Sequence, residues 1–103
     1  MIITTTDTMG GKNYEIVGLV CGNMVQSKNI GKDIGAGFKT IIGGELKGYT
    51  DMMSESREEA TRRMVAQAES LGADAIISMR YSASSIMQGA AEVMAYGTAV
   101  KFI

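Results

Sequence analysis

The chain has 103 residues, of which 46% are hydrophobic and 20% charged, and its formal net charge is −1. It therefore has no basic excess with which to bind nucleic acid, and no apolar run approaches the roughly 20 residues that a membrane-spanning helix needs. The chain lacks histidine, the commonest general base and metal ligand, and its single cysteine excludes an intrachain disulfide and fits a reducing cytoplasm. Its 11 acidic residues show no clustering, so we expect one cytoplasmic domain over residues 1–103 that is not an enzyme.

The first 29 residues predict two strands separated by a turn. Residues 1–7 are rich in β-branched side chains, which favour a short strand. Gly10 and Gly11 then favour a turn, because glycine adopts positive φ without steric cost. The largely apolar run over residues 14–29 predicts a long second strand.

This long strand has two apolar faces, since alternate side chains point to opposite sides of a sheet. One face carries Ile16, Gly18, Val20, Gly22, Met24 and Gln26. The other face carries Val17, Leu19, Cys21, Asn23, Val25 and Ser27. In a sheet with one face in water, one of these sets should have been polar. We therefore expect helices of the same chain to cover one face and a second copy of the chain to cover the other.

Apolar side chains recur at helical spacing over residues 29–44, which predicts a first helix. They are Ile30, Ile34, Phe38, Ile41 and Ile42. Gly31 and Gly35 share one side of this helix, where they favour close approach to a sheet or a neighbouring subunit. The glycines of this segment do not match a phosphate-binding loop, and packing explains them better.

A second helix is predicted over residues 54–72. Ser56 followed by Glu59 fits a capping box at its start, and Gly72 fits the residue that stops a helix. Ion pairs across one helical turn are expected for Glu58–Arg62 and Glu59–Arg63. The buried stripe is expected at Met53, Ala60, Met64, Ala68 and Leu71.

Two strands are predicted after this helix, over residues 73–83 and 91–103, with a connection over residues 84–90. In the first of them the odd positions from Ala75 to Ala83 form one apolar face. A hairpin centred near position 86 would place Arg80 opposite Glu92, which is a favourable cross-strand pair.

Cys21 and Met24 are the residues that suggest a soft-metal site, because thiolate and thioether sulfur bind ions such as Cu(I). On a regular strand, however, positions 21 and 24 point to opposite faces, and they converge only if Gly22 creates a bulge. No histidine or second cysteine completes a site within one chain. The simpler interpretation of Cys21 is a small buried hydrophobe. The alternative is a site at which Cys21 side chains from several copies face one another.

Several motifs together resemble those of the YbjQ-like family of small bacterial proteins, over about residues 3–103. They are Ile42-Gly43-Gly44 with Tyr49, Arg57 with Ala60, Leu71-Gly72-Ala73-Asp74-Ala75, and Tyr96-Gly97-Thr98-Ala99-Val100. Members of this family have a heavy-metal-binding label and no established function. The label matches Cys21 and Met24 only loosely, so no cofactor follows from the resemblance.

The resemblance implies a dodecin-like α+β subunit of order β-β-α-α-β-β, in which helices wrap a curved antiparallel sheet. It further implies a closed homo-oligomeric ring, a pentamer or a decamer of stacked pentamers. The glycines of these motifs serve the fold or the assembly: Gly43 and Gly44 allow a turn, Gly72 stops a helix, and Gly97 allows a bend or a close backbone neighbour in a strand.

Three functional hypotheses remain. The first is a non-enzymatic module that assembles copies of itself or binds a ligand at the resulting ring. The second is a heavy-metal binder that uses Cys21 at subunit contacts. The third, from fold analogy alone, is a carrier of a small molecule such as a flavin, with a stacking surface drawn from Tyr81, Tyr96 or Phe38.

Overall fold

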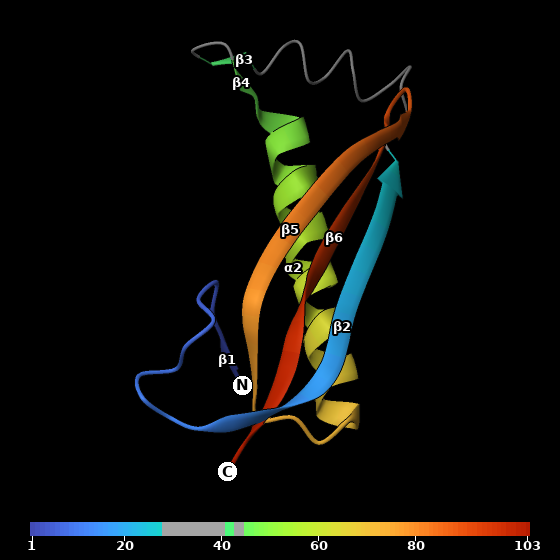
Figure 1. The fold of residues 1–103 in the computed structure, drawn as a ribbon. Coiled ribbons are helices and arrows are strands. Elements are labelled where there is room, and N and C mark those ends of the chain that lie inside the picture. The colour runs from blue at the N-terminus through green and yellow to red at the C-terminus, as the bar shows by residue number, and fades with distance from the viewer. Residues whose placement is uncertain (28–40, 43–44) are drawn as a thin grey trace.

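The computed structural model of the chain describes residues 1–27, 41–42 and 45–103. Its main sheet has the strand order β1-β5-β6-β2. The four strands are β1 (Ile2–Ile3), β2 (Tyr14–Ser27), β5 (Ala75–Met87) and β6 (Ala90–Phe102). Helix α2 lies along one face of this sheet, as Figure 1 shows, so the predicted α+β class is confirmed.

The sheet is mixed, and the prediction of a wholly antiparallel sheet is wrong at one edge. β6 pairs antiparallel with both β2 and β5, whereas β1 pairs parallel with β5 through Ile2–Ala75 and Ile3–Ile76. The reason is topological. β1 and β2 are consecutive in the chain but lie at opposite edges of the sheet, so the segment between them crosses the sheet instead of forming a hairpin.

Helix α2 (Lys47–Ser70) begins seven residues before the predicted start at residue 54. Ser56 is therefore inside the helix, where it is buried, and its hydroxyl is 2.8 Å from the carbonyl oxygen of Met52, one turn back. A serine that bonds this carbonyl does not cap a helix, so the predicted capping box is absent. The predicted first helix falls largely outside the described residues, and its Ile41–Ile42 forms strand β3, which pairs with β4 (Glu45–Leu46).

The C-terminal end of α2 is a Schellman motif centred on Gly72. Gly72 has φ +75°, the backbone amide of Ala73 donates to the carbonyl of Ala68 over 3.1 Å, and that of Gly72 donates to Glu69 over 3.0 Å. These two bonds satisfy carbonyls that the helix end leaves unpaired. The chain then turns directly into β5.

A bulge at Ser78 divides β5 into two parts. Ser78 has φ +53°, and the pairing with β6 shifts between Ile77 and Arg80. The backbone amides of Ser78 and Met79 donate to the carbonyls of Thr6 and Thr4 over 2.9 and 3.0 Å. Because the bulge changes the alternation, the single apolar face predicted for residues 75–83 is split: Ile77 belongs to one buried cluster and Met79 to another.

The β5–β6 hairpin turns at Gln88 and Gly89, two residues beyond the predicted centre. Arg80 consequently lies opposite Tyr96, and Glu92 lies opposite Ser84. The predicted Arg80–Glu92 pair is therefore wrong, because a strand that continues to Met87 moves the register.

Two buried clusters lie on opposite faces of the sheet. The main core joins α2 to β2, β5 and β6 and contains Val20, Ala60, Met64, Ala68, Ile76, Met79, Val93, Ala95 and Ala99. The smaller cluster contains Ala75, Ile77 and Val100, with partly buried Met9, Tyr14 and Phe102 packed against it. The N-terminal segment thus covers only one end of the face that α2 leaves open (Figure 1).

Candidate functional site

Helix α2 comes closest to the sheet at Gly22 on β2. A Cβ atom at this position would lie 2.3 Å from the carbonyl oxygen of Ala60, 2.4 Å from the backbone nitrogen of Met64 and 2.7 Å from Cβ of Arg63. Two of these three atoms belong to the helix backbone, which cannot move aside as a flexible side chain can. Only glycine therefore permits this spacing between helix and strand.

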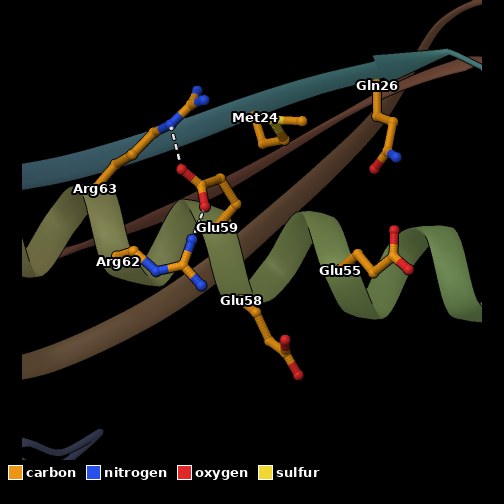
Figure 2. Close-up of a pocket in the computed structure, with 7 residues that line it drawn as sticks. All are labelled: Met24, Gln26, Glu55, Glu58, Glu59, Arg62 and Arg63. Carbon is orange, nitrogen blue, oxygen red and sulfur yellow. Dashed lines mark hydrogen bonds and ion pairs between the residues drawn. The ribbon is translucent and has the colours of Figure 1, made fainter.

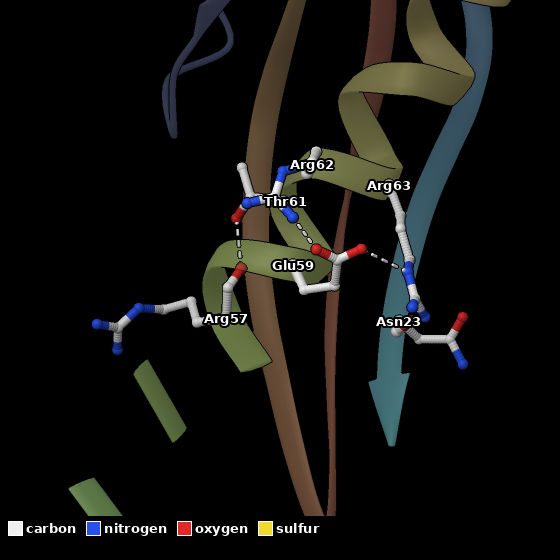
Figure 3. A network of polar contacts seen from close by, with 6 residues as sticks. All are labelled: Asn23, Arg57, Glu59, Thr61, Arg62 and Arg63. Atoms are coloured by element: carbon white, nitrogen blue, oxygen red, sulfur yellow. Dashed lines mark hydrogen bonds and ion pairs between the residues drawn. The ribbon is translucent and has the colours of Figure 1, made fainter. Parts of the chain in front are cut away.

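Next to this contact, one carboxylate organises two arginines (Figure 3). Glu59 accepts a hydrogen bond from Arg63 Nε over 3.1 Å and also pairs with Arg62, three residues along the helix. The predicted Glu59–Arg63 pair is confirmed, whereas Arg62 bonds Glu59 and not the predicted Glu58. Arg63 also donates from Nη1 to the backbone carbonyl of Asn23 over 2.7 Å. Glu59 thereby holds Arg63 in position against β2.

A second helix side chain bonds the backbone of β2 in the same way. Gln67, one turn beyond Arg63, accepts a hydrogen bond at Oε1 from the backbone amide of Cys21 over 2.7 Å. Residues 63 and 67 lie one above the other on a helix, and residues 21 and 23 point the same way on a strand. The two periodicities therefore match at this contact.

A cavity of about 330 Å³, lined mostly by charged residues, lies between β2 and α2, as Figure 2 shows. Its lining residues are Met24, Gln26, Glu55, Glu58, Glu59, Arg62 and Arg63. Met24 and Gln26 come from β2 and face the helix, while Glu58 points away from Met24. Both oxygens of Glu59 already bond arginines. Within the described residues, no group of three histidine, cysteine or acidic side chains could hold a metal ion, in this cavity or elsewhere.

The described residues leave the opposite face of the sheet largely uncovered next to the smaller cluster. We call this surface the open face; it is formed by Leu19, Cys21, Asn23, Val25, Met94 and Tyr96. Leu19 is 74% exposed and Val25 is 53% exposed. Arg80 lies opposite Tyr96 on β5, and the amide nitrogen of Asn23 lies 3.4 Å from Glu92. The open face is therefore mostly apolar, and Arg80 and Glu92 lie at its border.

The structure does not bring Cys21 and Met24 together. Cys21 is exposed and lies opposite Tyr96, whereas Met24 is half-buried, lies opposite Val93 and lines the cavity beside α2. Pairing with β6 is continuous from Gly18 to Ser27, so no bulge at Gly22 turns one residue toward the other. The two sulfur atoms therefore lie on opposite faces of β2.

Met94 is the sulfur-containing neighbour of Cys21 on the open face. It lies opposite Asn23, two residues from Cys21 along the strand, which makes Cys21 and Met94 diagonal neighbours on adjacent strands. The sequence could not reveal this pair, because it depends on the register between β2 and β6. One thiol and one thioether in a protomer still leave a soft-metal site incomplete.

The remaining predicted residues are spread over the fold. Gly43 and Gly44 lie outside the described residues, as does Phe38. Gly97 is a place of close approach, since a Cβ there would lie 2.7 Å from Cγ2 of Ile76 and 3.0 Å from the carbonyl oxygen of Ile77. Tyr81 contacts the Thr61 hydroxyl of α2 over 2.8 Å, and Tyr96 is on the open face. The two tyrosines therefore do not form one stacking surface.

The roles of Arg63 and Gln67 were not predicted from the sequence. The sequence predicts Arg63 as the ion-pair partner of Glu59 and assigns no role to Gln67. The signal that was present is their spacing of four residues beside the buried stripe of α2.

No helix among the described residues is long and apolar enough to cross a membrane.

Similar sequences cover the whole chain. The YbjQ-like family pattern, described as "Putative heavy-metal-binding", matches residues 1–103. A protein from Thermotoga petrophila named "UPF0145 protein" is 62% identical over 102 residues, which are 98% of this chain and 96% of that one. A UPF0145 protein from Clostridium novyi is 59% identical over 103 residues, the full length of both chains.

A solved structure supports the fold. The crystal structure of a protein of unknown function in the DUF74 family, from Pediococcus pentosaceus, superposes with a TM-score of 0.72. The alignment covers 100% of this chain and 98% of that chain at 20% sequence identity. At this identity the similarity concerns the arrangement of helices and strands.

Proposed function

The chain belongs to the YbjQ-like family, and we propose that it is a non-enzymatic module that assembles copies of itself through the open face of its sheet. The observation that carries the proposal is the exposure of Leu19 and Val25, 74% and 53%, on one side of a strand whose other side is packed against α2. Ile16 extends the same strand and is 70% exposed. Fully burying such a side chain contributes about 1.5–3 kcal/mol, which offsets part of the free-energy cost of association.

A second copy suits this face for two reasons. Most oligomers of soluble proteins are formed by identical chains, and every copy presents the same apolar strip. The open face also has both signs of charge at its border, with Arg80 opposite Tyr96 and Glu92 beside Asn23. Opposite charges at the border of a surface can be complementary between copies. The net charge of −1 per chain adds little repulsion.

The finer form of the assembly follows from the family resemblance. It is a ring of five dodecin-like subunits, or ten as two stacked rings. In such a ring the open faces line the subunit contacts, and pockets or a central pore lie between copies. Strand β1 lies at the edge of the main sheet opposite β2, and β3 and β4 form a separate pair.

The test is the mass of the protein in solution, measured by light scattering coupled to size exclusion. We expect the wild type to form a multimer of defined size. Leu19→Asp and Val25→Asp should each shift the protein toward the monomer, because a carboxylate in the contact loses its hydration. Far-UV circular dichroism checks that the variants remain folded.

The matched control is Leu71→Asp, since Leu71 is 50% exposed, directly follows the last residue of α2 and is not on the open face. This control should keep the wild-type mass. A wild type that is a folded monomer in dilute solution would contradict the proposal. So would a loss of assembly in Leu71→Asp equal to that in Leu19→Asp.

A second candidate function is binding of a soft metal ion at the contacts between copies. Cys21 is exposed on the open face with Met94 as a diagonal neighbour, so assembly through this face could gather sulfur atoms from several chains. A thiol binds Cu(I) as the thiolate and releases its proton to solvent. The family description is consistent with this candidate and names no residues.

Elemental analysis of protein loaded with Cu(I) under reducing conditions tests this candidate. Cys21→Ser should abolish binding, and Met94→Leu should weaken it. Met24→Leu is the control, because Met24 lies on the helix side of β2 and should leave the stoichiometry unchanged. Retention of the full metal content by Cys21→Ser would reject the candidate.

A further inference from the structure

β2 forms one edge of the main sheet along its whole length. Its 14 residues pair with β6 on one side, and no strand of the described residues pairs with the other side. The middle of β2 is apolar, with Leu19, Val20, Met24 and Val25. A long apolar edge strand is a template on which a strand from another chain can add.

The backbone amide of Cys21 points to this free edge. It donates to Oε1 of Gln67 over 2.7 Å, so it does not donate to β6. Along an antiparallel strand the N–H and C=O groups of one residue point the same way, and those of the residue two places on point that way too. The outward direction at Cys21 therefore also applies to Asn23.

The outward carbonyl of Asn23 is occupied by Arg63, whose Nη1 lies 2.7 Å from it. Arg63 is fixed at its other end by Glu59, over 3.1 Å. One donor and one acceptor of the edge are thus bonded by two side chains that lie one helical turn apart. These are groups that a neighbouring strand would need for its own ladder.

Gly22 makes this arrangement possible. It lies between Cys21 and Asn23, and its missing side chain lets the backbone of α2 come within contact distance of β2. With the helix at that distance, the side chains of Arg63 and Gln67 can reach the strand edge.

We propose that Gln67 and Arg63 form a cap that closes the free edge of β2 against a strand from a second copy. The cap prevents the sheet from growing from chain to chain through β2. Copies can then meet through the open face but not by extending the sheet. The inference concerns the edge alone and does not require that the open face assembles.

The experiment removes the polar groups of the cap and keeps the length of the side chains. Gln67→Met and Arg63→Met are made singly and together, because methionine is also a good helix former. Arg62→Met is the control: Arg62 also bonds Glu59 but makes no hydrogen bond to β2 among those the structure describes. Two readouts are used, namely hydrogen exchange of the Cys21 amide and thioflavin T fluorescence during incubation at high protein concentration.

In Gln67→Met we expect the Cys21 amide to exchange at least about tenfold faster, because one hydrogen bond is lost. In the double variant we expect thioflavin-positive, sheet-extended assemblies that grow with protein concentration, at several times the wild-type signal. Arg62→Met should behave as the wild type in both readouts.

Faster exchange without extended assemblies would overturn the proposal, since the edge would then be open and still not add strands. Unchanged exchange in Gln67→Met would overturn it as well. If the double variant does not fold, the proposal is tested with Gln67→Met alone, by both hydrogen exchange and thioflavin T fluorescence. A monomeric wild type would contradict the proposed assembly through the open face, but the edge variants could still be compared with the wild type to test the cap.

Discussion

The two edges of the main sheet are protected in different ways. At β2 the edge is apolar, and two side chains of α2, Arg63 and Gln67, bond its backbone. At β5 the distal half of the edge, residues 81–87, is exposed, and the hydrogen bond that the structure describes from it to α2 is the one between Tyr81 and Thr61. This stretch is rich in serine, and its pairing shifts between Ser85 and Met87. The apolar edge at β2 is thus covered by another element, whereas the edge at β5 has an irregular register, which is one of the ways in which a sheet edge avoids further pairing.

The difference originates in where α2 can approach the sheet. The helix packs chiefly on β2 and β6 and makes few contacts with β5. At Gly22 the missing side chain lets the backbone of α2 contact β2 directly. On β5 the contact with α2 is made by the Tyr81 side chain, whose hydroxyl lies 2.8 Å from that of Thr61. Gly22 therefore allows side chains of α2 to reach the edge of the sheet at β2.

Gly22→Ala should have the largest effect on the contact between α2 and the edge at β2. The added methyl group would overlap the backbone of α2 at Ala60 and Met64, at 2.3 and 2.4 Å, so the helix must move away from β2. We expect a loss of about 3 kcal/mol in the free energy of unfolding, at the upper end for an overpacked core. Urea denaturation monitored by circular dichroism measures it.

The control for this variant is Gly97→Ala on β6. There the added methyl group meets Cγ2 of the buried Ile76 side chain at 2.7 Å, the Ile77 carbonyl oxygen at 3.0 Å and Cα of Met79 at 3.3 Å, so its contacts with the backbone are longer than those at Gly22. A side chain can rotate away more easily than a helix backbone can move, so we expect a loss of about 1–2 kcal/mol. Equal losses in the free energy of unfolding for the two variants would contradict the expectation that the contact between Gly22 and the helix backbone is the less tolerant of a side chain.

Much of this architecture could be predicted from the sequence. The long strand before the helix, the stop at Gly72 and the final hairpin all follow from local signals such as apolar periodicity and glycine position. Ser56 misled the prediction of the helix start, because its hydroxyl is as suited to bonding a carbonyl one turn back as to capping.

The functional surfaces were less accessible to sequence reasoning, because they depend on long-range register. The two apolar faces of the long strand indicated that one would remain uncovered, and the exposure of Leu19 agrees with this. The pairing of Cys21 with Met94 on that face needs the alignment of β2 with β6. The bulge at Ser78 likewise depends on hydrogen bonds to the N-terminal segment, which no local pattern encodes.

The smallest effect is expected for Ser78→Gly, which tests whether the bulge at Ser78 constrains β5. Ser78 has φ +53°, a conformation that costs a residue with a side chain about 1–2 kcal/mol, and glycine removes this cost. Glycine also loses more conformational entropy on folding, by about 0.5–1 kcal/mol. The net result should be a gain of about 0.5 kcal/mol in the free energy of unfolding, measured by urea denaturation. Ser78→Val should instead destabilise the protein, since a β-branched residue tolerates this conformation poorly. If valine were tolerated as well as glycine, the bulge would not constrain β5, and its exposed half would owe its position to the Tyr81 contact with Thr61 instead.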